Sequence, residues 1–262
     1  MPDRTDVVYH YDGSFQGFLC CVFQAYAHRE DPALILSADA CQESLFAPRY
    51  IQTEKGQAAR VLRAIPQKMG PAGLELVRLG FLCRLPQREL LLLRLLRLGF
   101  AQGPSLLRRL TEEPVCTLEK AVRALKHEAH LYTGFVRFSE YQGALSAVIT
   151  PKNQVLPLLA SHFVQRFPDE SFLIYDKTHH MALVHQGRTA IVPLENVQLP
   201  APTEEERRCR ALWQQFYQTV SIQQRENPRC QMSHMPKRFW ADLTEDPGGL
   251  RQKQLGRKGL GD

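Results

Sequence analysis

The chain has 262 residues, of which 44% are hydrophobic and 23% are charged. These fractions resemble those of soluble globular proteins, and they exclude intrinsic disorder, collagen-like repeats and a small disulfide-stapled fold. The net charge is +6, and arginine supplies 24 of the 33 basic residues. Arginine suits bidentate phosphate contacts and stacking on bases, although it also forms surface salt bridges.

The cysteine pattern and the hydropathy indicate a cytoplasmic protein. The seven cysteines form no CxxC pair and no repeated spacing. An odd number of cysteines without a secretory leader predicts reduced thiols. The longest uncharged run, 13–28, contains two glutamines and a histidine and is too short and too polar to span a membrane. We therefore expect no membrane contact.

The N-terminal region predicts strands around one helix. VVYHY at 7–11 alternates as a strand does, and Asp12-Gly13 is a turn signal. Ser14 can cap a helix over 15–29. The apolar residues expected to share the buried face of this helix are Phe18, Leu19, Val22, Phe23 and Tyr26. Further strands are expected around 33–37 and 49–53.

The stretch 55–130 is predicted to be almost wholly helical. Proline and glycine divide it into about five short helices. The expected breaks are Pro66, Gly70-Pro71, Pro86, Gly99 and Gly103-Pro104. Gly99 and Phe100 are expected to end one helix, as a glycine cap with its hydrophobic contact.

After Tyr132 the pattern changes to strands. The expected segments are a hairpin over 134–139 and 144–149, a helix over 155–167, three strands over 171–176, 181–185 and 189–193, and a polar helix over 204–220. The order ββαβββ with short connections predicts a small antiparallel sheet packed on a helix, and hence an α+β fold.

The elements predict two main regions and a tail. Residues 1–131 are expected to form a mainly helical basic region with a short N-terminal strand pair. Residues 132–246 should form an α+β region with a C-terminal helix and an extended tail motif, and 247–262 a disordered tail.

Basic charge is concentrated in residues 49–110, which hold 12 basic and 3 acidic side chains. A basic helical half beside a mildly acidic remainder is typical of a phosphate-binding surface. The alternative is that arginine only keeps leucine-rich helices soluble. Arg94 and Arg97 are expected to share one helix face, and Arg60 and Arg63 repeat this spacing. The predicted nucleic-acid contacts here are Arg60, Arg63, Arg94, Arg97, Arg108 and Arg109.

The tail combines bases, amides and aromatic residues, a mixture that suits stacking on unpaired nucleobases. The predicted contacts are Arg225, Arg229, Lys237, Arg238 and Trp240. The alternative is that Phe239 and Trp240 pack on the core while the arginines pair with acids such as Asp242.

No motif for a nucleophilic serine, a phosphate loop, a radical SAM cluster or a zinc site occurs, so we predict no metal and no cofactor. Acid–base chemistry leaves no motif. Asp12 and Asp176 each end a predicted strand, and His179 lies in the turn that follows Asp176. These three residues are candidate catalytic groups. The alternative for both aspartates is a role in stabilising the turn.

Three stretches resemble one bacterial family. They are YDGSFQGFLCCVFQAY at 11–26, GFVRFSE with ALSAVITPKNQVLPLLASHFVQRFPDESFLIYD at 134–176, and a tail ending in MPKRFWADLTE at 213–245. The family comprises DNA-metabolism or DNA-repair proteins of unknown function encoded beside a radical SAM protein, some of them fused to a uracil-DNA-glycosylase-like domain. The resemblance implies a pathway and a partner rather than a reaction. No glycosylase domain is expected here, because the sequence ends at Asp262.

Together these observations predict an accessory protein of DNA repair or DNA modification. It is expected to bind DNA, including single-stranded or damaged DNA, and to work with a radical SAM partner. One alternative is an enzyme that acts on nucleic acid or a nucleotide through Asp12, Asp176 and nearby histidines. The other is an adaptor whose leucine- and arginine-rich helices dock the partner protein.

Overall fold

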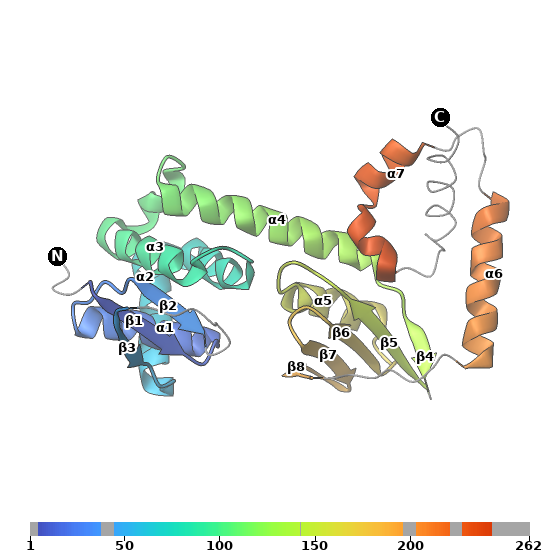
Figure 1. Ribbon diagram of the computed structural model, residues 1–262, viewed down its shortest axis with the longest axis horizontal. Coiled ribbons are helices and arrows are strands. Elements are labelled where there is room, and N and C mark those ends of the chain that lie inside the picture. Colours follow the sequence, from blue (N-terminus) through green and yellow to red (C-terminus); the bar gives the residue numbers. More distant parts are fainter. Residues whose placement is uncertain (1–4, 38–44, 142, 196–202, 221–226, 243–262) are drawn as a thin grey trace. The chain divides into compact units, whose positions relative to one another are not determined.

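The structure is a computed structural model that describes residues 5–37, 45–141, 143–195, 203–220 and 227–242. The chain divides into two compact units, Met1–Leu125 (unit 1) and Lys126–Asp262 (unit 2). The division falls within helix α4 (Glu113–Phe135), which Figure 1 shows in green. The disordered tail predicted for 247–262 lies outside the described residues.

Unit 1 contains a three-stranded parallel sheet of β1 (Val7–Tyr11), β2 (Leu34–Ser37) and β3 (Ala47–Tyr50), in the order β2-β1-β3. Helix α1 (Phe15–Ala27) makes the crossover from β1 to β2 that a parallel pair requires. The strands expected around 7–11 and 33–37 are present, and the one expected around 49–53 lies at 47–50, so that the predicted strand pair is a sheet of three strands. The third is a mostly exposed edge strand that includes Pro48, a residue confined to such edges.

Of the predicted helix breaks, those at Pro66 and Gly99 do not occur. Helix α2 (Lys55–Leu82) continues through Pro66, but it is interrupted at Gly70, where φ is +77° and ψ is 172°, as the Gly70-Pro71 pair predicts. Helix α3 (Arg88–Gln102) continues through Gly99 and ends at Gly103, where φ is +73°. The prediction that Gly99 ends a helix is wrong. Gly99 packs against Met69 of α2, and the absence of a side chain lets the two helices approach closely.

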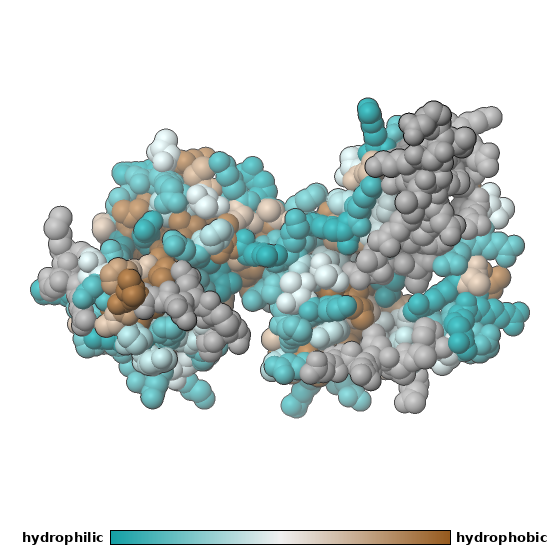
Figure 2. Space-filling model, in the orientation of Figure 1, coloured by the Kyte–Doolittle hydropathy of each residue, from teal (hydrophilic) through white to brown (hydrophobic). Residues whose placement is uncertain are grey.

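The leucines of α3 form much of the core of unit 1. The stretch Arg88–Arg108 is long and apolar enough to cross a membrane by composition. Seven of its leucines are nevertheless buried within the unit, as in the core helix of a soluble protein: Leu90, Leu91, Leu92, Leu93, Leu95, Leu96 and Leu106. Figure 2 shows hydrophilic residues over most of the visible surface, with hydrophobic residues in small patches between them.

Unit 2 contains a five-stranded mixed sheet in the order β4-β5-β6-β7-β8. The strands are β4 (Ser139–Tyr141), β5 (Ala144–Ile149), β6 (Phe172–Asp176), β7 (Met181–Gln186) and β8 (Arg188–Pro193). Three pairings are antiparallel, but β5 and β6 are parallel. The prediction of an antiparallel sheet is wrong at this pair. Helix α5 (Leu156–Arg166) returns the chain to the end of the sheet at which β5 begins, so β6 runs in the same direction as β5. The carboxyl ends of β5 and β6 consequently lie together.

The C-terminal part of unit 2 is helical. Helix α6 (Glu204–Val220) has the predicted bounds. The tail motif, predicted to be extended, instead forms helix α7 (Pro228–His234) and the 3-10 helix η3 (Lys237–Asp242). Asn227 supports the start of α7, because its side chain accepts a hydrogen bond of 3.1 Å from the backbone N–H of Cys230.

Candidate functional site

Exposed bases gather along the N-terminal half of α2. Arg60, Arg63 and Lys68 are exposed, and no described acidic side chain pairs with any of them. Arg60 and Arg63 are about one helical turn apart, and Lys68 lies about two turns beyond Arg60, on the side of Arg60 away from Arg63. Arg60 is therefore flanked by one predicted contact residue and by one unpredicted base.

Aromatic rings lie under two of these bases. The guanidinium carbon of Arg60 is 5.7 Å from the ring centre of Phe23, and Nζ of Lys68 is 5.1 Å from that of Phe100. Phe100 in turn contacts Tyr26, with 5.8 Å between ring centres. Exposed cation–π contacts stabilise by about 0.5–1 kcal/mol each. We call these five residues, contributed by α1, α2 and α3, the basic aromatic face.

Further bases follow the end of α3. The 3-10 helix η1 (Gly103–Arg108) packs on α2 and α3, and Gly103 lies directly against the backbone of Lys68. Arg108 and Arg109 are exposed at the end of η1. The Arg109 guanidinium donates a hydrogen bond of 3.1 Å to the Gln102 side chain. A neutral amide leaves the charge of Arg109 uncompensated.

Arg94 and Arg97 do not form the exposed pair that the sequence predicts. Arg94 is exposed, without an acidic partner among the described residues. Arg97 is half-buried: it donates to the Asp31 carboxylate at 2.6 Å and to the backbone oxygen of Glu30 at 2.5 Å. The segment after α1 thus covers one edge of α3 and neutralises Arg97.

The sequence prediction did not assign Phe23, Tyr26 and Phe100 to a site. Their spacing places Phe23 and Tyr26 on the expected apolar stripe of α1, yet Phe23 is half-buried and Tyr26 is 46% exposed. Burial of part of the ring still raises the pKa of Tyr26, against the opposing effect of the Arg97 charge, so its hydroxyl is neutral at pH 7. A useful signal was available: Tyr26 lies two residues before the polar run His28–Asp31, near the end of the predicted helix.

Two residues of the tail are built into unit 2. Phe239 is only 1% exposed and contacts the rings of Tyr132 and Phe135, at 4.9 and 5.2 Å between ring centres. Arg238 makes an ion pair of 3.3 Å with Glu128. The partner acid is thus on α4, whereas the sequence suggested Asp242. These contacts agree with the packing alternative for Phe239 and Arg238.

The remaining tail residues are more accessible. Trp240 is half-buried and donates its indole N–H to the Met235 carbonyl at 2.9 Å. Nζ of Lys237 lies 5.9 Å from the Trp240 ring centre, and Lys237 and Arg229 are exposed. Arg225 lies outside the described residues.

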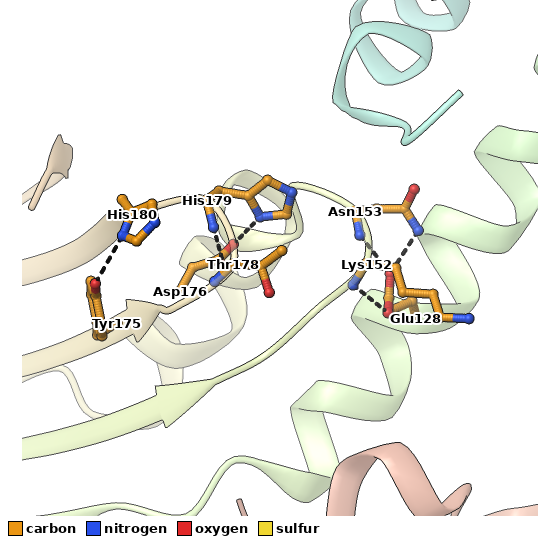
Figure 3. A network of polar contacts seen from close by, with 8 residues as sticks. All are labelled: Glu128, Lys152, Asn153, Tyr175, Asp176, Thr178, His179 and His180. Atoms are coloured by element: carbon orange, nitrogen blue, oxygen red, sulfur yellow. Dashed lines mark hydrogen bonds and ion pairs between the residues drawn. The ribbon is translucent and has the colours of Figure 1, made fainter. Parts of the chain in front are cut away.

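A buried carboxylate organises the loop after β5 (Figure 3). Glu128, on α4, is 2% exposed and accepts backbone N–H groups of Lys152 and Asn153, each at 3.0 Å. It also accepts the Asn153 side-chain amide at 2.6 Å. With Arg238, four donors surround this carboxylate, which offsets the cost of burying its charge. Sequence reasoning missed Glu128, because an acidic residue within a predicted helix does not by itself indicate a buried carboxylate.

Asp176 and His179 form a hydrogen-bonded pair in the turn after β6 (Figure 3). Asp176 is 1% exposed. One oxygen accepts the backbone N–H groups of Thr178 and His179, and the other lies 2.7 Å from Nδ1 of His179. When Nδ1 donates to this carboxylate, Nε2 carries the lone pair. Among the described residues none bonds Nε2, so the pair can act as a base. The two backbone hydrogen bonds that Asp176 accepts also stabilise the turn, which is the alternative role expected for this residue.

Asp12 belongs to unit 1 and is held by its own turn. Its carboxylate accepts the backbone N–H and the hydroxyl of Ser14, at 2.9 and 2.7 Å, and the hydroxyl of Thr53 at 2.7 Å. Partial burial opposes ionisation, but the hydrogen bonds from Ser14 and Thr53 outweigh it and lower the pKa of Asp12. Ser14 caps α1, as predicted, by accepting the Gly17 N–H. Asp12 and Asp176 are therefore separate candidates.

Cysteine chemistry and metal binding find little support in the described residues. Cys21 and Cys83 are buried, and burial raises the pKa of both thiols, that of Cys83 to about 11. Such thiols are poor nucleophiles at neutral pH. No group of three or more histidine, cysteine, aspartate or glutamate side chains in the described part of the chain could hold a metal ion.

The comparisons with known proteins define a family without a known activity. The family model for a domain of unknown function, DUF4130, matches residues 86–245, and the chain belongs to this family. The match runs from the start of α3 through the tail motif. It includes Phe100, Glu128 and the Asp176–His179 pair, but not the α1 and α2 parts of the basic aromatic face. No curated protein and no solved structure matches the chain.

Proposed function

We propose that this protein binds nucleic acid through unit 1 and acts as an accessory factor in DNA repair or DNA modification. The observation that carries the proposal is the set of exposed, unpaired bases on α2: Arg60, Arg63 and Lys68. Arg108 and Arg109 add two exposed bases at the end of η1. A line of unpaired cations attracts a polyphosphate backbone without reading sequence.

The proposal contains a partner as well. The sequence resembles a family whose members are encoded beside a radical SAM protein, and this resemblance supports joint action with such an enzyme. Copurification of the chain with that partner tests this part. A partner that copurifies while the isolated chain shows no affinity for nucleic acid would support the adaptor alternative.

Binding is tested by fluorescence anisotropy with labelled DNA at low salt. Each phosphate contact should contribute about 0.7–0.9 to the slope of log affinity against log salt concentration. We expect Arg60→Glu and Arg63→Glu to lower both the affinity and the slope. Arg188→Glu, an equal change of charge at an exposed position on β8, is the control. If the wild-type chain binds no DNA at about 50 mM salt, the proposal fails.

A second function is favoured by the Asp176–His179 bond of 2.7 Å. A buried aspartate that orients a histidine is the arrangement of a general base. The exposed Lys152 at the end of the neighbouring β5 gives this edge a positive charge that suits an anionic substrate. We therefore propose, as the alternative, acid–base chemistry on nucleic acid or a nucleotide.

This alternative is tested on modified oligonucleotides, with products identified by mass spectrometry. His179→Gln should abolish product formation, and Asp176→Asn should reduce it, because the carboxylate that orients the His179 ring is lost. His180→Gln is the matched control, since His180 is exposed and, among the described residues, its ring hydrogen-bonds to the Tyr175 hydroxyl alone, at 3.4 Å. Full activity in His179→Gln would eliminate this function.

A further inference from the structure

We propose that the basic aromatic face binds unpaired nucleobases, so that the ligand of unit 1 is single-stranded nucleic acid. This inference rests on the proposed function and specifies its ligand. Its starting point is that cations and aromatic rings alternate on this face: Arg60 lies over Phe23, and Lys68 over Phe100, which contacts Tyr26. Proteins that bind single strands combine these two kinds of group, one for phosphates and one for bases.

Tyr26 is the residue best placed to meet a base. It is 46% exposed at the C-terminal end of α1, and Phe100 supports its ring. Because Phe100 already holds one face of this ring, the ring has lost part of its side-chain freedom. Stacking a base on the exposed face therefore costs little further conformational entropy. Its neutral hydroxyl adds no repulsion toward phosphates. Duplex DNA presents its base edges in grooves but not its base faces, so this ring has no stacking partner in a duplex.

Arg60 and Lys68 supply charge at both ends of this platform. They are separated by about 12 Å along α2, given a rise of 1.5 Å per residue. No described acid neutralises either charge. Three other arginines of unit 1 are neutralised by acids: Arg97 by Asp31, Arg88 by Glu89 and Arg49 by Glu30. Arg60 and Lys68 keep their charge and lie on the same face as the exposed aromatic ring.

The test compares strands of equal charge with and without bases. The full chain is titrated into a labelled thymidine strand of about 20 nucleotides, an abasic strand of the same length, and a blunt duplex, at about 50 mM salt. The base-containing strand should bind most tightly. Tyr26→Ala should weaken its binding by about 5- to 150-fold, the range for loss of one stacked base, and should change duplex and abasic binding by less than about twofold.

Two variants separate stacking from other effects. Tyr26→Phe keeps the ring and should retain the affinity for the base-containing strand. Tyr50→Ala removes another exposed tyrosine of the same unit, 77% exposed on β3, and should leave all three affinities unchanged. Thermal melting of each variant shows that the fold is intact.

The outcomes distinguish the two proposals. Equal affinity for the base-containing and abasic strands, or no loss in Tyr26→Ala, would overturn the stacking inference and leave nucleic-acid binding in place. A chain that binds none of the three ligands would overturn nucleic-acid binding itself and with it this inference.

Discussion

Individual side-chain contacts determine which charges of unit 1 remain available. Arg60 and Arg97 look alike in the sequence, because each lies on a predicted helix three residues from a second arginine. Arg97 is neutralised by Asp31, whereas Arg60 rests on an aromatic ring that leaves its charge in place. A count of basic residues therefore overstates the charge that a ligand meets, and the ion pairs of the folded chain correct it.

The same reasoning gives a prediction for Asp12. Hydrogen bonds to its ionised form lower the pKa of Asp12 in the folded state below its ordinary value, so ionisation stabilises the fold at pH values above the unfolded-state pKa. Asp12→Asn should reduce stability at neutral pH. The difference from the wild type should shrink as pH falls through the folded-state pKa, where the wild-type carboxyl also becomes neutral.

Chemical denaturation between about pH 7 and pH 3 measures this difference. Asp169→Asn, at an exposed position without a described hydrogen-bond partner, is the control and should match the wild type at each pH. A constant difference between Asp12→Asn and the wild type across this range would contradict the assignment.

At the scale of elements, close approach of α2 and α3 depends on Gly99. A Cβ atom at this position would lie 2.4 Å from Sδ and Cε of Met69, which is fully buried. Gly99→Ala should destabilise the protein by about 1–3 kcal/mol, because the core must shift to admit the methyl group. Gly56→Ala, on α2 with open space around it, should be neutral or slightly stabilising.

A double-mutant cycle checks the cause. Met69→Ala alone creates a cavity and is destabilising, but it also leaves room for the methyl group of Gly99→Ala. The effects of the two changes on the free energy of unfolding should therefore sum to more than the effect of the double variant. Strict additivity would show that the helices are not in contact through this pair.

Most elements could be predicted because their signals are local. The α1 cap, the α6 bounds and strands β5 to β8 follow from residues within a few positions of one another. The strand expected over 134–139 is wrong, because α4 continues to Phe135 and β4 begins only at Ser139. The parallel pairing of β5 and β6 depends on which edge α5 returns to, which is not local. Gly99 shows the same limit: glycine is a common helix terminator, and only the position of Met69 explains why the helix continues.

The candidate sites were less predictable than the elements. Exposed arginines can be found by charge alone, but Tyr26 belongs to the face only through Phe100, which is distant in sequence. Glu128 likewise acquires its importance from donors on the loop after β5 and on the tail. The Asp176–His179 pair was predictable, because a strand end and a three-residue spacing bring the two side chains together.

At the scale of the whole molecule, two separate compact units imply separable effects. Phe239 is buried among aromatic residues of unit 2, so Phe239→Ala should destabilise that unit by about 3–5 kcal/mol. Affinity for nucleic acid, which we assign to unit 1, should change little. Hydrogen exchange resolved by segment, together with the DNA titration, measures both quantities.

Trp240→Ala is the control for this experiment, since the Trp240 ring is only half-buried and its removal should cost less stability. A loss of DNA affinity in Trp240→Ala, with its stability retained, would show that the tail contributes to binding after all. Loss of affinity in both variants would show that the two units are coupled.

The ion pair between Glu128 and Arg238 has a consequence for biosynthesis. The ribosome makes the carboxylate about a hundred residues before its cation, a delay of about 5–20 s at ordinary rates of elongation. During that interval the nascent unit 2 lacks both this charge partner and the Phe239 ring. A chain released early would keep that defect permanently, and such chains are the ones that cellular proteases remove. Translation through the tail motif is thereby required before the buried carboxylate of Glu128 meets Arg238.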